Sequence, residues 1–255
     1  MRARTLGRHL ALLACRCAKA SAPRRPAIVL YHSIGEPGGV APSLFVRHLA
    51  YLGDRFRVVP LRDLVAGLGT EDPDSGHPLA AITFDDGNRD NAEVALPLLE
   101  AAGIRATFFL LPPRLRTGDV DAFGHAGMDV AQARELVAAG HEIGAHTLTH
   151  PRLTRVSVEM ARQEIAASRA ELEDSLGVEV SSFAYPKGDH NAVVRSLVAE
   201  CGYRCAATVR EGLVHADAHM LALPRISARP AESMLVFGCK AHPGIDLYER
   251  LVGRA

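Results

Sequence analysis

The sequence of 255 residues has no surplus of charge, no disulfide-like set of cysteines and no long apolar run. Its 29 basic and 29 acidic side chains cancel, so it lacks the cationic surface typical of nucleic-acid-binding proteins. Five cysteines are an odd number and form no disulfide framework for a chain of this size, which favours a reducing compartment. No stretch approaches the roughly 20 apolar residues of a membrane-spanning helix. We therefore expect no nucleic-acid partner, no transmembrane span and a cytoplasmic location.

The first 25 residues differ in composition from the rest of the chain. A basic start precedes a short apolar run, which Arg16 ends, whereas a secretory signal needs roughly 7–15 apolar residues. We interpret residues 1–25 as a basic leader that is either amphipathic or disordered, and residues 26–255 as one folded domain. Export or membrane attachment through this leader is the alternative to the cytoplasmic prediction. The sequence leaves the oligomeric state open.

Short apolar runs alternate with amphipathic helical patterns along most of the chain. Strands are predicted at 27–31, 57–61, 79–84, 106–111, 141–145, 178–185, 203–209 and 221–226, and helices at 45–52, 91–102, 129–139, 157–176, 191–200 and 232–240. This alternation indicates an α/β fold with a mostly parallel sheet. Seven or so repeats fit an incomplete or distorted barrel better than an open sheet.

Two carboxylates stand side by side where the predicted strand 79–84 ends. Successive side chains of a strand point to opposite faces, so Asp85 and Asp86 share a site only if the strand has ended there. Gly87 permits the turn that would end it. The loops that follow parallel strands carry the chemistry in such folds. The alternative is a polar turn in which Asn88 or Asp90 caps the next helix, and this leaves the two acids unexplained.

Two histidines four residues apart follow the predicted strand 141–145. On a helical turn His146 and His150 would share a face and could bind one metal ion. The alternative is two unrelated surface histidines beside a proline turn. With Asp86 they make a set of two imidazoles and one carboxylate that leaves positions open for water, as a catalytic metal site requires. Asp85 would then take a proton from that water.

These motifs together resemble those of the polysaccharide deacetylases, carbohydrate esterase family 4. The matching segments occur in the family's order and are TFDDG (83–87), HTLTHP (146–151) and FAYPKG (183–188). The likeness extends from about residue 27 to about residue 226, and LYHSI (30–34) is similar to the branch that includes deacetylases of bacterial poly-N-acetylglucosamine. The resemblance implies a distorted (β/α) barrel of about seven parallel strands.

The resemblance also implies an activity, which is hydrolytic removal of acetyl groups from N-acetylated sugars of a glycan or glycan precursor. It assigns the general base to Asp85 and the ligands of one divalent ion, zinc with cobalt or nickel as alternatives, to Asp86, His146 and His150. Two alternative functions stay open. In the first, the same metal site acts on O-acetyl esters or cyclic amides. In the second, the protein is a non-catalytic, metal-stabilised glycan-binding domain. The retained Asp85 argues against the second, because a structural site needs no further free acid.

Five more residues receive expected roles from the resemblance. His32 would be the general acid, with a polar residue at a strand end as the alternative. Arg225 would hold Asp85 in its charged form, with a structural salt bridge as the alternative. Tyr185, Pro186 and Lys187 would contact the substrate, with Tyr185 and the backbone beside it lining the acetyl pocket. The chain departs from the family in three respects: Lys187 stands where an aromatic residue is common, the tryptophan of a common fourth motif is missing, and no Leu-Leu-His-Asp signature follows the last strand.

Overall fold

The computed structural model describes residues 25–69, 76–121 and 124–241, so the predicted leader lies outside them except for its last residue. Within these residues the sheet has eight parallel strands: β1 (Ala27–Tyr31), β2 (Arg57–Val58), β3 (Leu79–Phe84), β4 (Thr107–Leu110), β5 (Glu142–Ala145), β6 (Ser182–Ala184), β7 (Cys205–Glu211) and β8 (Leu223–Ser227). Seven of them close into a barrel, because β1 pairs with both β8 and β3, while β2 pairs only with the start of β3. The predicted barrel is confirmed.

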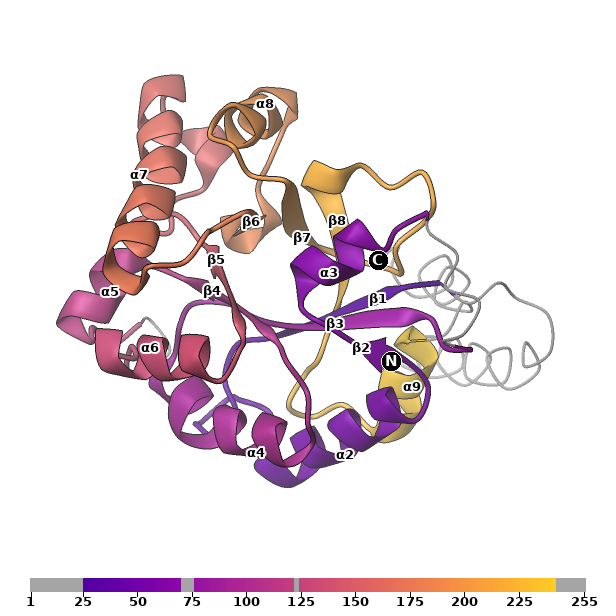
Figure 1. The fold of residues 1–255 in the computed structure, drawn as a ribbon. Coiled ribbons are helices and arrows are strands. Elements are labelled where there is room, and N and C mark those ends of the chain that lie inside the picture. The colour runs from indigo at the N-terminus through magenta and orange to yellow at the C-terminus, as the bar shows by residue number, and fades with distance from the viewer. Residues whose placement is uncertain (1–24, 70–75, 122–123, 242–255) are drawn as a thin grey trace, which may run out of the picture.

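Helices surround this barrel (Figure 1). They are α2 (Pro42–Gly53), α3 (Leu61–Ala66), α4 (Leu96–Ala101), α5 (Pro112–Thr117), α6 (Val130–Ala138), α7 (Val158–Leu176), α8 (Ala192–Glu200) and α9 (Met234–Lys240), with a π-helical turn at Asn91–Ala95 before α4. None of the helices described here has the length and apolar character that crossing a membrane requires.

Two short helices replace parts of predicted strands or loops. The strand predicted at 57–61 is wrong beyond Val58, because Pro60 is the N-cap of α3 and the helix begins at Leu61. Pro112 and Pro113 end β4 as expected, but they also begin α5, where proline costs no hydrogen bond in the first turn. Both helices have six residues, too few to show a helical period in the sequence.

Alternate residues of each strand face two different apolar layers. One layer lies inside the barrel and contains Ile28, Ala81, Phe109, Ala184 and Leu223, together with Leu61 and Leu64 of α3. The other lies between the strands and the surrounding helices and includes Val29, Ile82, Phe108, Phe183 and Ile226. Because the backbone N–H of Leu61 donates to the hydroxyl of Thr107 at the start of β4, α3 closes the amino-terminal end of the barrel. The carboxyl ends of the strands meet at the opposite end, where parallel barrels place their functional residues.

Candidate functional site

Asp86, His146 and His150 come together at the carboxyl end of the barrel. Asp86 follows β3, and the two histidines belong to the loop after β5. Oδ1 of Asp86 lies 3.5 Å from Nε2 of His146 and 3.5 Å from Nε2 of His150. Two atoms that each lie about 2.1 Å from a tetrahedral ion are about 3.4 Å apart, so these spacings fit ligands of one ion. The one ligand atom from each residue lies within 4.8 Å of the other two.

The backbone brings these side chains together through residues in the left-handed region. Asp86, Thr147 and His150 have φ angles of 73°, 69° and 60°, a conformation that is uncommon for residues other than glycine. The two histidines do not lie on a helical turn, because residues 146–150 contain no helix and the chain bends at Leu148 and Thr149. The histidines nevertheless converge because the chain reverses at Thr147, whose hydroxyl accepts a hydrogen bond from the backbone N–H of His150 at 3.0 Å. Such unfavourable conformations cluster at functional sites.

A buried carboxylate on α7 holds the loop that carries the two histidines. Glu164 is 4% exposed and accepts hydrogen bonds from the backbone N–H groups of Leu148 and Thr149, at 2.8 and 2.9 Å. It also accepts one from the hydroxyl of Thr149 at 2.6 Å. Glu164 is not among the functional residues predicted from the sequence. The available signal was its place within the apolar stripe of α7, between Ala161 and Ile165, where a carboxylate needs a buried partner.

Both imidazoles turn a ring nitrogen toward Asp86. Nδ1 of His146 donates to the carbonyl oxygen of Ala184 at 2.7 Å, which directs Nε2 toward Asp86 as the nitrogen available to a metal. Metal-binding histidines commonly have such a second hydrogen bond, because it fixes the tautomer and the ring orientation. Burial, and then the nearby His146, lower the pKa of His150 to about 4, so its ring is neutral at pH 7. The donor set therefore fits a divalent ion.

Asp85 lies inside the barrel and is paired with Arg225. Its carboxylate accepts two hydrogen bonds of 2.7 Å from the guanidinium, and the two residues are 2% and 0% exposed. Burial alone would raise the pKa of Asp85, but Arg225 and then His146 lower it to about 2. Nε of Arg225 donates to the carbonyl oxygen of Thr208 at 2.7 Å, which orients the guanidinium. The predicted contact between Arg225 and Asp85 is therefore present, and Asp85 is ionised at neutral pH.

His32 lies in the same cavity as Asp86. The cavity has a volume of about 340 Å³, and its other walls come from the loop after β1, including Gly38, and from the segment that contains His125. The His32 side chain is exposed, and it is close enough to lower the pKa of Asp85. The structure thus brings the predicted general acid to the open side of the metal ligands.

Polar residues just after the aspartate pair hold the loop of His32. The side-chain amides of Asn88 and Asn91 both donate to the carbonyl oxygen of His32, at 3.1 and 2.9 Å. The carboxylate of Asp90 accepts hydrogen bonds from the hydroxyl of Ser33 and from the backbone of the next residue. The interpretation of Asn88 or Asp90 as a helix cap is wrong, since neither side chain caps the helix that follows. The residues that these two side chains hold in the His32 loop lie over 50 positions away in the sequence.

The three predicted substrate contacts separate in the structure. The Tyr185 side chain faces the layer outside the barrel, where its hydroxyl donates to the carbonyl oxygen of Leu221 at 2.9 Å. Its backbone N–H donates to Ala207 at 3.1 Å, so the sheet uses this group. Pro186 is buried, whereas Lys187 is exposed, has a φ of 58° and lies near enough to His150 to influence its pKa. The structure therefore brings Lys187 to the metal ligands but not the side chain of Tyr185.

The comparisons with known proteins agree with this site. A family model described as polysaccharide deacetylase matches residues 72–206. The chain belongs to the polysaccharide deacetylase family. YxkH of Bacillus subtilis, which is named provisionally as a polysaccharide deacetylase, is 27% identical over 224 residues, which are 86% of this chain and 77% of YxkH.

Solved structures confirm the barrel fold of this polysaccharide deacetylase. The Streptococcus pyogenes deacetylase PplD, solved in complex with acetate, has a TM-score of 0.77 and 24% identity, covering 87% of this chain and 100% of that one. IcaB from Ammonifex degensii has a TM-score of 0.74 and 22% identity, covering 86% and 98%. The family's expected motifs lie together here at one end of the barrel, after β3, β5 and β6.

Proposed function

We propose that the protein is a metal-dependent hydrolase that removes acetyl groups from N-acetylated sugars of a glycan and releases acetate. The observation that carries this proposal is the convergence of Asp86, His146 and His150 beside an ionised Asp85. Membership of the polysaccharide deacetylase family supports the reaction and the substrate class. The 340 Å³ cavity next to these residues provides space for a sugar.

The metal would be held by one oxygen and two nitrogen ligands from Asp86, His146 and His150. Imidazole with carboxylate suits zinc, with cobalt and nickel as alternatives, and three protein ligands leave a position open for water and substrate. When bound, the ion would lower the pKa of a water molecule from 15.7 toward roughly 7 and polarise the acetyl carbonyl group. The hydrogen bond from His146 to Ala184 keeps the ligand nitrogen pointed at this position.

Asp85 is the proposed general base. Arg225 takes one hydrogen-bonding position on each carboxylate oxygen, and the remaining lone pairs can accept the proton of a water molecule. A carboxylate with a pKa of about 2 is a weak base, so Asp85 depends on a water that is already acidified. The advantage of the low pKa is that Asp85 is deprotonated, and so ready to act, at every physiological pH.

His32 is the proposed general acid. Its exposed imidazole shares the cavity with Asp86 and can protonate the sugar amine as it leaves. The hydrogen bonds from Asn88 and Asn91 fix its backbone without using the ring. Lys187, on the side of His150, is the proposed contact with the sugar hydroxyls or neighbouring units. The segment around His32 supports a substrate of the poly-N-acetylglucosamine type.

The test is acetate release from N-acetylglucosamine oligomers by protein stripped of metal and then supplied with zinc, cobalt or nickel. We expect release only with metal, and loss of release in His32→Ala and Asp85→Asn. Release from O-acetyl esters or cyclic amides, but not from the oligomers, would contradict N-deacetylation. Oligomer binding with no turnover of any of these substrates would show a glycan-binding domain instead.

A further inference from the structure

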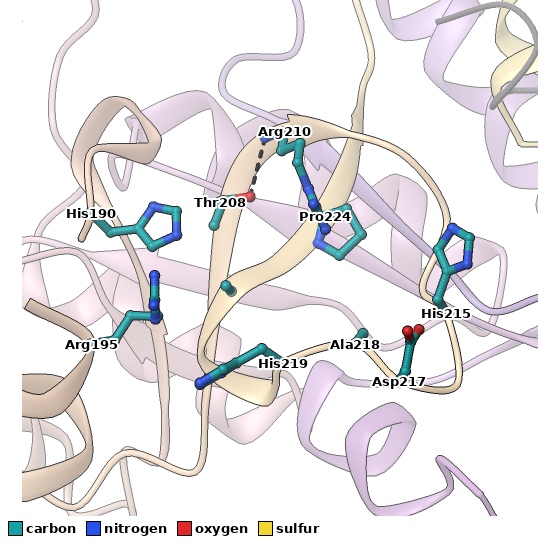
Figure 2. Close-up of a pocket in the computed structure, with 10 residues that line it drawn as sticks. His190, Arg195, Thr208, Arg210, His215, Asp217, Ala218, His219 and Pro224 are labelled. Carbon is teal, nitrogen blue, oxygen red and sulfur yellow. Dashed lines mark hydrogen bonds between the residues drawn. The ribbon is translucent and has the colours of Figure 1, made fainter. Parts of the chain in front are cut away.

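A second cavity, of about 550 Å³, lies outside the barrel beside β7 and the start of β8 (Figure 2). It exists because the connection from β7 to β8 contains only a short 3₁₀ turn at Met220–Ala222, whereas α-helices cover most other strands. The charged and imidazole side chains that line it are His190, Arg195, Arg210, His215, Asp217 and His219. None of these side chains has a part in the proposed hydrolysis.

Two guanidinium groups from different elements line this cavity. Arg195 belongs to α8 and Arg210 to β7. Within the part of the chain that the structure describes, neither side chain has an ion pair or a hydrogen bond. Asp217 is the acidic residue among the lining residues, and it forms no ion pair with either arginine in those same ranges. The cavity therefore carries an excess of positive charge with no internal counter-ion for the two arginines.

His219 adds a hydrogen-bond donor to this charge, whereas the rings of His190 and His215 have hydrogen bonds to Gly188 and Arg25. Nδ1 of His219 accepts a hydrogen bond from the backbone N–H of Leu221 at 3.1 Å, so in the neutral ring Nε2 carries the proton. Figure 2 shows Arg195 and His190 on one side of the cavity, His215 and Asp217 on the other, and Arg210 above His219. The guanidinium groups of Arg195 and Arg210 and the Nε2–H of His219 thus come from three different segments that border one space, as recognition of a multi-oxygen anion requires.

We propose that this cavity binds the phosphate group of a sugar phosphate. Arginine forks match phosphate geometry with paired hydrogen bonds, which are stronger than bonds between neutral groups. A volume of about 550 Å³ lies in the range typical of small-molecule sites. Ala218, Ala222 and Pro224 supply an apolar part of the wall, against which the carbon face of a sugar ring can pack. The proposal concerns binding alone and does not depend on the hydrolytic activity.

The test is titration calorimetry of the metal-loaded protein at low ionic strength, with N-acetylglucosamine 1-phosphate, inorganic phosphate and N-acetylglucosamine as separate probes. We expect the sugar phosphate to bind and its Kd to rise at least about tenfold in Arg195→Gln/Arg210→Gln, because two charge-assisted contacts are lost. The matched control is Arg47→Gln/Arg105→Gln, which removes two exposed arginines away from the cavity and should leave the Kd unchanged. Melting temperatures check that each variant is folded, and the single variants replace the double one if it is not.

Comparing the three probes shows whether the cavity recognises a sugar phosphate or phosphate alone. Sugar phosphate that binds more tightly than inorganic phosphate supports the proposal. Equal binding of the two would support a phosphate site but overturn the sugar. The same Kd in wild type and in Arg195→Gln/Arg210→Gln would overturn the proposal, because the anion would then bind elsewhere, for example at the metal. An equally large loss in the control variant would also overturn it, since the effect would be one of overall charge.

Discussion

The two ends of the barrel interior each contain a buried carboxylate, and the two carboxylates have opposite surroundings. At the open end, Asp85 is paired with the guanidinium of Arg225, and its pKa is lowered to about 2. At the end closed by α3, Glu142 is 2% exposed, and within the described residues its hydrogen-bond donors are all neutral, while the Arg62 charge is a minor influence on its pKa. The donors are the hydroxyls of Ser182 and Thr107, at 2.6 and 2.8 Å, and the backbone N–H of Arg62 at 2.9 Å.

The pKa values of the two acids move in opposite directions for this reason. Burial raises the pKa of Glu142, and its neutral hydrogen-bond donors offset this only in part. At Asp85 a full positive charge outweighs the same burial effect. Asp85 is therefore ionised where a proton acceptor is needed. Glu142 instead connects β4, β5 and β6 to α3 through its hydrogen bonds. The comparison shows that charge pairing, not burial, distinguishes the functional carboxylate from the structural one.

The largest effect should come from replacing the open-end acid. We expect Asp85→Asn to lower kcat for acetate release by about 10²–10⁴-fold, the usual contribution of a general base. The matched control at the closed end is Glu142→Gln, which keeps the hydrogen-bonding shape and should leave kcat unchanged. Steady-state acetate assays on both variants make the comparison. Similar losses in the two variants would show that the barrel needs both acids for its structure and that Asp85 has no special role.

Replacing Arg225 should destabilise the protein, because Asp85 would then be a buried carboxylate without a positive partner. Arg225→Met leaves a buried carboxylate without its charge partner, and we expect the free energy of unfolding to fall by about 3–5 kcal/mol. The pKa of Asp85 should rise, because burial then acts without Arg225. Urea unfolding at pH 7 measures the change. The double variant Asp85→Asn/Arg225→Met should recover part of the loss, and no recovery would argue against the pair as the cause.

A smaller effect is expected for the carboxylate that holds the histidine loop. Glu164→Gln weakens the three hydrogen bonds to Leu148 and Thr149 without removing a metal ligand. Outer contacts of this kind typically change metal affinity about 10–100-fold. Competition with a coloured zinc chelator measures the Kd, and Glu159→Gln, at an exposed position of the same helix, is the control. An unchanged zinc Kd together with a lower melting temperature would make Glu164 purely structural.

The smallest effect is the pH dependence of stability, and its sign should differ between the two ends. The folded pKa of Asp85 is lowered, so its contribution is present above the unfolded pKa of about 3.9 and is lost as pH falls toward 2. The folded pKa of Glu142 is raised, so stability is lost as pH rises above its unfolded value of about 4.3. Glu142→Gln removes that loss and should therefore gain stability relative to wild type as the pH rises above about 4.3.

Chemical unfolding at several pH values tests this difference. Relative to wild type, Asp85→Asn should be least stable near neutral pH and approach wild type in acid. Glu142→Gln should show the reverse trend. Parallel trends in the two variants would contradict the assignment of opposite pKa shifts.

The positions of the site residues that follow strands could be predicted from the sequence. The runs at 27–31 and 79–84 are strands with the predicted ends, and parallel strands bring the residues that follow them to one end of the barrel. Asp86 and the two histidines could therefore be predicted to meet. The barrel itself followed from the alternation of strands and helices together with the family resemblance.

The rest depends on contacts that leave no local pattern. Glu164 and its partners lie 15 or 16 positions apart, and the amides that hold His32 lie 56 and 59 positions from it. Thr147 and His150 have left-handed φ angles, which are uncommon for residues other than glycine and unexpected for a β-branched residue such as Thr147. One part of this remainder was predictable: successive residues of a strand face opposite sides, and Ala184 faces into the barrel. The side chain of Tyr185 could therefore have been predicted to lie outside it.

The central claim is that the adjacent aspartates divide the work, with Asp86 binding the metal and Asp85 accepting the proton. The most direct test measures zinc content and acetate release on the same samples of wild type, Asp85→Asn and Asp86→Asn. We predict that Asp85→Asn retains one zinc per chain and loses turnover, while Asp86→Asn loses zinc and turnover together. Loss of zinc in Asp85→Asn, or full turnover in either variant, would contradict the account.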